Sequence, residues 1–141
     1  MIPQVLTSRL TSFCFRLRPG QDLKKELLLY AETHQLKAAA ILSAVGSLKV
    51  ACLRLSDRKE TSEFTGPFEI VSLMGTVSAS GIHMHMSISD GDGKVLGGHL
   101  MDGCLVYTTA EIILLESTDL VFDRQMDEGT GYKELVVKAR E

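Results

Sequence analysis

The sequence predicts a single α+β domain, residues 1–141, in which one long helix accompanies a mostly antiparallel sheet. Three observations lead to this fold class. The length is ordinary for one domain, and no repeat, low-complexity tract or linker divides the chain. One segment carries apolar residues at helical spacing over several turns. The other apolar segments are short, rich in Val, Ile, Leu and Thr, and separated by Gly, Ser and Asp, which is typical of strands joined by hairpin turns.

The first two expected elements are a strand and the helix. Residues Ser12–Leu17 alternate polar and apolar side chains, which indicates a strand, and Pro19 with Gly20 ends it. Asp22 then stands at or near a helix N-terminus, where a carboxylate is favourable. Over Leu23–His34 the apolar residues recur at helical spacing, so we expect the helix there.

Two buried strands are expected after the helix. The run AAILSAVGS is predicted to be a strand that ends at Gly46. Val50–Leu55 is predicted to form a second strand after a tight connection. The polar stretch DRKETSEFTGP that follows is predicted to be a turn or loop ending at Gly66–Pro67.

Six further strands are predicted in the rest of the chain. Between the second and third of them, SDGDGK is a hairpin signal, because Asp-Gly pairs tolerate the positive φ angles of tight turns. A polar turn, DEGTG, separates the last two strands. The predicted ranges are Phe68–Val77, Ile82–Ser89, Lys94–Leu100, Cys104–Glu116, Asp119–Arg124 and Glu134–Lys138.

The charge distribution argues against nucleic acid as a partner. The chain is 45% hydrophobic and 23% charged, which is ordinary for a globular domain, and its formal net charge is −3. Between Glu60 and Asp123 the only basic residue is Lys94, against ten acidic residues. This part of the chain would repel a phosphate backbone, so we expect no nucleic-acid binding by the domain itself.

The cysteines and the apolar segments bear on location. Cys14, Cys52 and Cys104 are odd in number and widely spaced, which argues against a disulfide framework and for buried thiols in a cytoplasmic protein. The opening MIPQVLTSRL lacks the apolar stretch of a signal peptide. No apolar run approaches the ~20 residues that span a bilayer, so we expect no membrane association.

Three of the four histidines fall within the segment GIHMHMSISDGDGKVLGGHL. Side chains along a strand alternate between the two faces of the sheet. His83 and His85 are therefore expected on one face, with Met84 and Met86 on the other.

The turn decides whether the third histidine joins the pair. If it is centred between Gly91 and Asp92, His83 lies opposite residues 98–100. His99 then shares the neighbourhood of the pair, provided that the register brings its side chain to the same face, since a slip of one residue would turn it away.

Three imidazoles on one side of a sheet form a ligand set for a divalent transition metal, most simply Zn²⁺ with a fourth position left to water. Copper, nickel and iron accept imidazoles as well. Gly97 and Gly98 carry no side chains and leave room for a ligand or another chain. The alternative is that the histidines are hydrogen-bonded polar residues of a sheet face. His34, at the end of the expected helix, is assigned to the helix terminus and not to a metal.

Other candidate residues carry weaker signals. Glu111 lies in the apolar segment YTTAEIILLE, where it can accept a hydrogen bond from an imidazole or act as a general base; a structural or edge-strand acid is the alternative. Tyr107 and Thr109 share its strand face and can line the same cavity. Cys104 can act as a soft ligand but fits a buried thiol better. The sequence contains no phosphate-binding loop, nucleophile elbow or dinucleotide fingerprint.

Several blocks follow one another along the chain: FRLRPGQDLKKEL, AAAILSAVGSLKVACLRL, GPFEIVSLMGTVS and HMHMSISDGDGKVLGGHL, then TAEIILLE and TGYKEL. In this order they resemble the PPC (plant and prokaryote conserved) domain family. The resemblance implies a curved, largely antiparallel sheet packed against one main helix, assembling as a homotrimer. It also implies that His83, His85 and His99 bind a metal, most simply zinc.

The family includes stand-alone bacterial and archaeal domains and the C-terminal portion of plant AT-hook proteins. This chain has no AT-hook, meaning no Arg-Gly-Arg-Pro core in a basic arm, so DNA binding is not carried over. Three hypotheses remain. The first, which we favour, is a homotrimeric metal-binding domain of unassigned activity. The second is a metal-dependent enzyme acting on a small molecule, with Glu111 as base. The third is a protein-interaction module whose histidines are structural.

Overall fold

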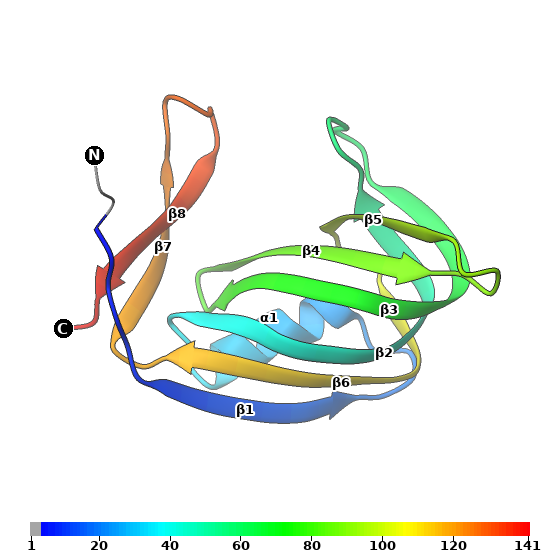
Figure 1. The fold of residues 1–141 in the computed structure, drawn as a ribbon, viewed down its shortest axis with the longest axis horizontal. Coiled ribbons are helices and arrows are strands. Elements are labelled where there is room, and N and C mark those ends of the chain that lie inside the picture. Colours follow the sequence, from blue (N-terminus) through cyan, green and yellow to red (C-terminus); the bar gives the residue numbers. More distant parts are fainter. Residues whose placement is uncertain (1–3) are drawn as a thin grey trace.

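The computed structural model describes residues 4–141; residues 1–3, which begin the predicted domain and the opening segment, lie outside the described residues. Within this range the chain forms eight strands and one helix (Figure 1). Their bounds are β1 Leu10–Leu17, α1 Leu23–Thr33, β2 Ala39–Arg54, β3 Ser62–Ser78, β4 Gly81–Ser89, β5 Val95–Leu100, β6 Leu105–Ser117, β7 Leu120–Met126 and β8 Lys133–Ala139.

The strand pairings among the described residues are all antiparallel, in line with the prediction. Six strands form one sheet in the order β1-β6-β2-β3-β4-β5, and the end of β2 also pairs with β5. Because of this second pairing the sheet curls back on itself, so that β2, β3, β4 and β5 surround one part of the core. β7 and β8 form a separate two-stranded hairpin, which stands beside the curved sheet in Figure 1.

The segment expected to form two strands is one continuous strand, β2. Gly46, the predicted end of the first, lies inside it, where the register with β6 shifts. A Cβ atom on Gly46 would run into the backbone carbonyl of Thr109, so only glycine allows the two backbones to come this close. The glycine therefore marks a β-bulge, and the prediction of a break there was wrong.

The predicted loop after β2 is shorter than expected. β3 begins at Ser62, so Gly66–Pro67 lies within the strand and not at the end of a loop. The register between β2 and β3 shifts at this point, which leaves both residues opposite Lys49. Proline has no N–H to donate, and it is tolerated here because a bulge leaves a residue without a ladder hydrogen bond.

The helix begins where the sequence predicts it. Asp22 is the N-cap, and its Oδ1 accepts hydrogen bonds from the backbone N–H groups of Lys24 and Lys25 at 3.1 and 3.2 Å. Leu23 and Leu27 lie on the face of the helix that packs against the sheet, and both are fully buried.

The helix covers only part of the sheet. It has eleven residues and packs mainly against β3 and β6. The curvature of the sheet closes the rest of the core, so the domain is dominated by the sheet, and the predicted packing against one main helix holds only in part. The one helix found within residues 4–141 is too short to cross a bilayer.

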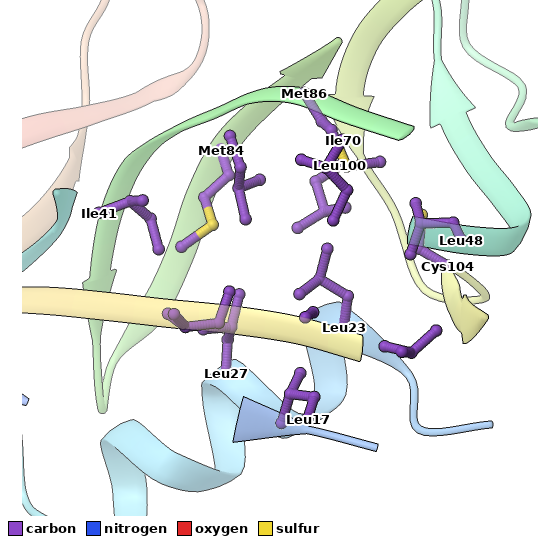
Figure 2. Packing of buried hydrophobic residues seen from close by; sticks show 14 of the residues in the cluster. Leu17, Leu23, Leu27, Ile41, Leu48, Ile70, Met84, Met86, Leu100 and Cys104 are labelled. Carbon is purple, nitrogen blue, oxygen red and sulfur yellow. The ribbon is translucent and has the colours of Figure 1, made fainter. Parts of the chain in front are cut away.

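The core lies between α1 and the inner face of the curled sheet. Figure 2 shows Leu23 and Leu27 of the helix on one side of it, with Met84 and Met86 of β4 and Leu100 of β5 on the other. The two methionines are buried, as predicted from the period of two along the strand. His83, which precedes Met84, and His85, which lies between the two methionines, must therefore face away from the core.

Two of the three cysteines are buried thiols, as predicted, but Cys14 is exposed. In β1, Phe13 and Phe15 turn toward Tyr30 of the helix, with ring centroids 6.3 and 4.1 Å from that of the tyrosine. Cys14, between them, faces outward. The prediction was wrong there because side chains alternate along β1, and only the face that carries Phe13 and Phe15 packs against the helix.

Candidate metal centre

The histidine cluster is built on the hairpin of β4 and β5. His83 and His85 lie on the outward face of β4. His99 lies on β5, directly opposite His85 in the ladder, so the register brings all three side chains to one face. The predicted register was wrong, because it placed His83 opposite residues 98–100 of β5, where the structure has His85 opposite His99. On its other side β4 pairs with β3, and there His83 lies opposite Thr76.

The turn explains the corrected register. The backbone N–H of Asp90 donates to the carbonyl of Lys94 at 3.0 Å, which leaves a loop of three residues centred on Asp92. The Asp90 carboxylate also accepts hydrogen bonds from the backbone N–H groups of Asp92 and Lys94, at 2.9 and 3.0 Å. Gly93 closes the loop with a φ of 77°, a left-handed conformation that favours glycine.

The three imidazoles lie close enough to share one ion. One nitrogen from each ring lies within 4.8 Å of the others, and no further group of three or more His, Cys, Asp or Glu residues with metal-site spacing is found in the described part of the chain. The ring centroids are 5.1 to 5.6 Å apart. Two nitrogens bound tetrahedrally to one zinc ion lie about 3.4 Å apart, given Zn–N bonds of about 2.0–2.1 Å. Small side-chain rotations therefore suffice, and the donor set fits a divalent transition metal.

The surroundings keep two of these imidazoles neutral. Burial first, and then the nearby positive charge of Arg54, lower the pKa of His99 from 6.5 to about 4. Burial also lowers the pKa of His83, with Arg124 as the next cause. A neutral imidazole has a free lone pair, which is the form that binds a metal ion.

Two glycines let β5 fit between its neighbours. A Cβ atom on Gly97 would lie 2.7 Å from the carbonyl oxygen of Met86 on β4. A Cβ atom on Gly98 would lie 2.7 Å from the carbonyl oxygen of Arg54 on β2. The glycines thus allow the close backbone approach that closes the sheet and places His99, and both also line a cavity.

Three cavities border the histidines: the first of about 730 Å³, the second of about 610 Å³, and a third of about 400 Å³ that is lined by His83 and His85 but not by His99. The first lies toward the connection that follows β2, and the second lies toward the β7–β8 hairpin. His85, His99, Arg54 and Tyr132 line the first two, and His83 lines the second. The candidate ligands therefore face space large enough for a small molecule.

The structure places the weaker candidates elsewhere. Glu111 is an exposed residue of β6, opposite Arg16 of β1, and lines none of these cavities. Thr109 accepts a hydrogen bond from Arg16 Nε at 2.9 Å, and Tyr107 lines a different cavity. The expected role of Glu111 as a base beside the histidines gains no support from this arrangement.

The remaining two candidates also stand apart from the histidine cluster. Cys104 is buried, and its Sγ accepts a hydrogen bond from the backbone N–H of Cys52 at 3.2 Å, as expected of a core thiol. His34 is the C-cap residue of α1, as predicted, and its ring centroid lies 4.2 Å from that of Tyr30.

Sequence reasoning did not single out Arg54 or Tyr132, which border the site. Arg54 follows the apolar run ACL directly, and it reaches His99 only because β2 pairs with β5. Tyr132 precedes β8 in a polar turn. The sequence holds no signal for either position, because both depend on contacts between segments far apart along the chain.

A curled antiparallel sheet with a histidine cluster on one hairpin defines a small domain with a candidate metal site. The sequence model of the Plants and Prokaryotes Conserved (PCC) domain matches residues 6–118. The chain belongs to this family, the PPC family that its sequence blocks resemble.

Solved structures share the fold. A hypothetical protein from Salmonella cholerae-suis is 39% identical, with a TM-score of 0.95 over 96% of this chain and 99% of that one. A metal-containing protein from Archaeoglobus fulgidus is 29% identical, with a TM-score of 0.83 over 95% and 99%. A plant- and prokaryote-conserved protein from Pyrococcus horikoshii, 24% identical, has a TM-score of 0.77 over 96% and 97%, and that likeness concerns the fold alone.

Two longer proteins contain a related segment. Both are called bifunctional protein GlmU and come from Synechococcus strains JA-3-3Ab and JA-2-3B'a(2-13). Each is 47% identical to this chain, and the match covers 96% of the chain for the first protein and 87% for the second. The chain spans only 22% and 20% of their length, so it matches one segment of each, and we carry over no activity from their name.

Proposed function

We propose that the chain is a metal-binding domain that holds one divalent transition metal ion, most simply Zn²⁺, on His83, His85 and His99. The observation that carries this is the convergence of three imidazoles from two neighbouring strands, with one nitrogen of each within 4.8 Å of the others. Three protein ligands leave a coordination position open to water or to a ligand. Copper, nickel and iron are the alternative occupants, because each accepts imidazole ligands.

Two further observations support the proposal. The lowered pKa values of His83 and His99 keep these imidazoles neutral at neutral pH. A related protein, from Archaeoglobus fulgidus, is described as metal-containing. The competing interpretation, in which the histidines are only structural, gives no reason for three imidazoles to face a cavity.

The domain is also proposed to form a homotrimer. Support comes from apolar side chains left uncovered on the sheet: Val45, Val71 and Met74 are 60, 55 and 56% exposed. Exposed apolar residues on neighbouring strands favour a protein partner, and copies of the same chain are the simplest one. Sedimentation equilibrium tests the trimer independently of the metal.

A metal-dependent enzyme acting on a small molecule is the second candidate function. The cavity of about 730 Å³ beside the histidines favours it. When bound, a metal with an open position polarises an oxygen group and lowers the pKa of a water molecule. Since Glu111 lies away from the cavity, any general base would have to come from elsewhere, so we keep this function second.

We propose further that the domain acts in the cytoplasm, with no nucleic acid as a partner of its own. The net charge of −3 supports the second statement. The free thiols of Cys52 and Cys104, which sit together in the core without a disulfide, agree with a reducing compartment.

The metal proposal is tested by isothermal titration of the metal-free protein with Zn²⁺, for the wild type and for His83→Ala, His99→Ala and His34→Ala. We expect the first two variants to lose stoichiometric binding while remaining folded oligomers. His34→Ala is the matched control, because this histidine lies at the helix terminus, and it should bind like the wild type. Full binding by both site variants would refute the assignment.

A further inference from the structure

Arg54 lies in line with two histidines of the site. Strand β5 lies between β2 and β4. His99 on β5 is directly opposite Arg54 on β2 and also directly opposite His85 on β4. Directly opposed residues of antiparallel strands share a face, with Cβ atoms about 4.5–5.5 Å apart. The three side chains therefore form one row across β4, β5 and β2, with two imidazoles followed by a guanidinium.

The guanidinium of Arg54 has no carboxylate to pair with. None of the four ion pairs formed within residues 4–141 includes it. Four other arginines of the molecule have a side-chain partner. Arg9 pairs with Asp119 at 2.8 Å and Arg140 with Glu116 at 2.9 Å. Arg16 donates to Thr109 Oγ1 at 2.9 Å, and Arg124 donates to Thr76 Oγ1 at 3.0 Å. Arg54 is half-buried and lines the first two cavities, so its charge is available to whatever occupies them.

Around the first cavity, basic side chains outnumber acidic ones. Arg54, Arg58 and Lys59 line it, against the single carboxylate of Asp57. Asp57, Arg58 and Lys59 are exposed and come from the connection after β2. Arg54 stands nearest to the histidines along this wall, because it alone is part of the strand paired with β5.

The second cavity does not reverse this balance. Arg124 and Lys133 line it together with two acids, Asp123 and Glu134. The Asp123 carboxylate already pairs with Lys138 at 2.7 Å, so its negative charge is largely neutralised. One acid, Glu134, is then left to oppose the basic side chains on this side.

An unpaired guanidinium beside a metal site works against metal binding, because like charges repel. Neutral imidazoles do not reduce the charge of a divalent ion, so the loaded site would carry two positive charges with a third next to them. Such an arrangement is stabilised by an anion that touches both the metal and the guanidinium. The position of Arg54 is thus unfavourable for a purely structural metal and favourable for an anionic ligand.

We infer that the site binds small molecules through an oxyanion group, a carboxylate or a phosphate, held between the metal's open position and the guanidinium of Arg54. This inference rests on the proposed metal function and adds the chemical class of the ligand to it. The planar fork of arginine matches the paired oxygens of either group. The cavity of about 730 Å³ accommodates the rest of the molecule.

The test uses protein loaded with Co²⁺, whose visible absorption reports the coordination of the ion. The loaded protein is titrated with acetate and with inorganic phosphate, for the wild type, Arg54→Gln, Arg54→Lys and Arg18→Gln. Arg18 is the matched control, because it is exposed and lines none of these cavities. The preferred probe, acetate or phosphate, tells carboxylate ligands from phosphate ligands.

Arg54→Gln should weaken anion binding about tenfold or more, the loss expected for a charge-assisted hydrogen bond. The same variant should bind Co²⁺ as tightly as the wild type or more tightly, because a repelling charge is gone. Arg54→Lys should recover part of the anion affinity, and Arg18→Gln should change neither property. By linkage, the anion should raise the affinity of the wild type for Co²⁺ by the factor by which Co²⁺ raises its affinity for the anion.

Three outcomes would overturn the inference, and they differ from one another. Equal anion affinities for the wild type and Arg54→Gln, with unchanged cobalt spectra, would reject the anion site and leave the metal site standing. Loss of Co²⁺ and anion binding together in Arg54→Gln would show that the residue is structural. A wild-type protein that takes up no Co²⁺ would refute the proposed function itself, and the anion site with it.

Discussion

His99 on β5 lies directly opposite Arg54 on β2, and the two meet only because the end of β2 turns back to close the sheet. This pairing places a positive charge beside the imidazole, and burial together with this charge lowers the pKa of His99 to about 4. It also fixes one end of the row of side chains that runs from His85 through His99. Sheet closure and the chemistry of the site are therefore linked through a single pair of residues.

Gly98→Ala should disturb this closure and the metal site together. A Cβ atom on Gly98 would lie 2.7 Å from the backbone carbonyl of Arg54, so the strands would have to separate. We expect a loss of about 1–3 kcal/mol in the free energy of unfolding, the usual cost of overpacking, together with weaker Zn²⁺ binding. Urea unfolding and zinc titration measure the two effects.

Gly91→Ala is the control for that variant. Gly91 lies in the turn after β4, and a Cβ atom there would meet nothing within 4 Å. The substitution should change neither stability nor zinc affinity by a measurable amount. Equal effects of the two glycine substitutions would show that the close approach of β2 and β5 is unimportant.

The metal-free protein should become less stable as the pH falls from about 6.5 to about 4. The pKa of His99 is lowered to about 4 in the folded chain, whereas an unfolded chain has the ordinary value of 6.5. Between these values the unfolded state binds more protons, so acidification favours unfolding; above pH 7 both states are neutral and the effect vanishes. Urea unfolding in the presence of a chelator at pH 7.5, 6 and 5 measures this dependence.

His99→Gln should flatten that pH dependence, because glutamine does not titrate. Other groups, the carboxylates among them, contribute to the slope in both proteins, so the difference between the two curves is the informative quantity. Identical curves for the wild type and His99→Gln would contradict the assignment of a lowered pKa to this residue.

The core requires the helix even though the helix covers only part of the sheet. Leu27 is fully buried and faces β4 and β5 across the core, whereas Leu29, two residues further along the helix, is 55% exposed. Leu27→Ala should lower the free energy of unfolding by about 2–5 kcal/mol, and Leu29→Ala by less than about 0.5 kcal/mol. Chemical denaturation of both variants checks this, and comparable losses would mean that α1 is packed differently.

The purified protein should not bind duplex DNA at moderate salt. Its formal net charge is −3, and Lys94 is the only basic residue between Glu60 and Asp123. Fluorescence anisotropy with a labelled duplex at several salt concentrations tests this. Tight binding that weakens steeply with salt would show that the basic side chains are arranged differently from the way we describe them.

Much of the site followed from local patterns. The period of two along β4 put His83 and His85 on one face and the two methionines in the core, and the Asp-Gly turn brought β5 back beside β4. The register in the structure differs from the predicted one, because the hydrogen-bonded pair of Asp90 and Lys94 leaves three residues in the loop. A sequence with several adjacent glycines and aspartates does not specify which of them close the turn.

The missed features depend on contacts between distant segments. Arg54 became part of the site through the pairing of β2 with β5, which no local pattern encodes. Gly46 and Pro67 resembled strand breaks, because bulges and chain ends use the same residue types. Cys14 was expected in the core because its neighbours are apolar, but Phe13 and Phe15 take the face of β1 that packs on the helix, so Cys14 between them faces outward.

The measurement that tests the central claim most directly is elemental analysis, by mass spectrometry, of the purified, tag-free protein prepared without added metal or chelator. The proposal predicts about one transition metal ion, most simply zinc, for each chain, held by His83, His85 and His99. Protein that contains no transition metal, and takes up none when it is reconstituted, would contradict the metal site and favour a protein-interaction module.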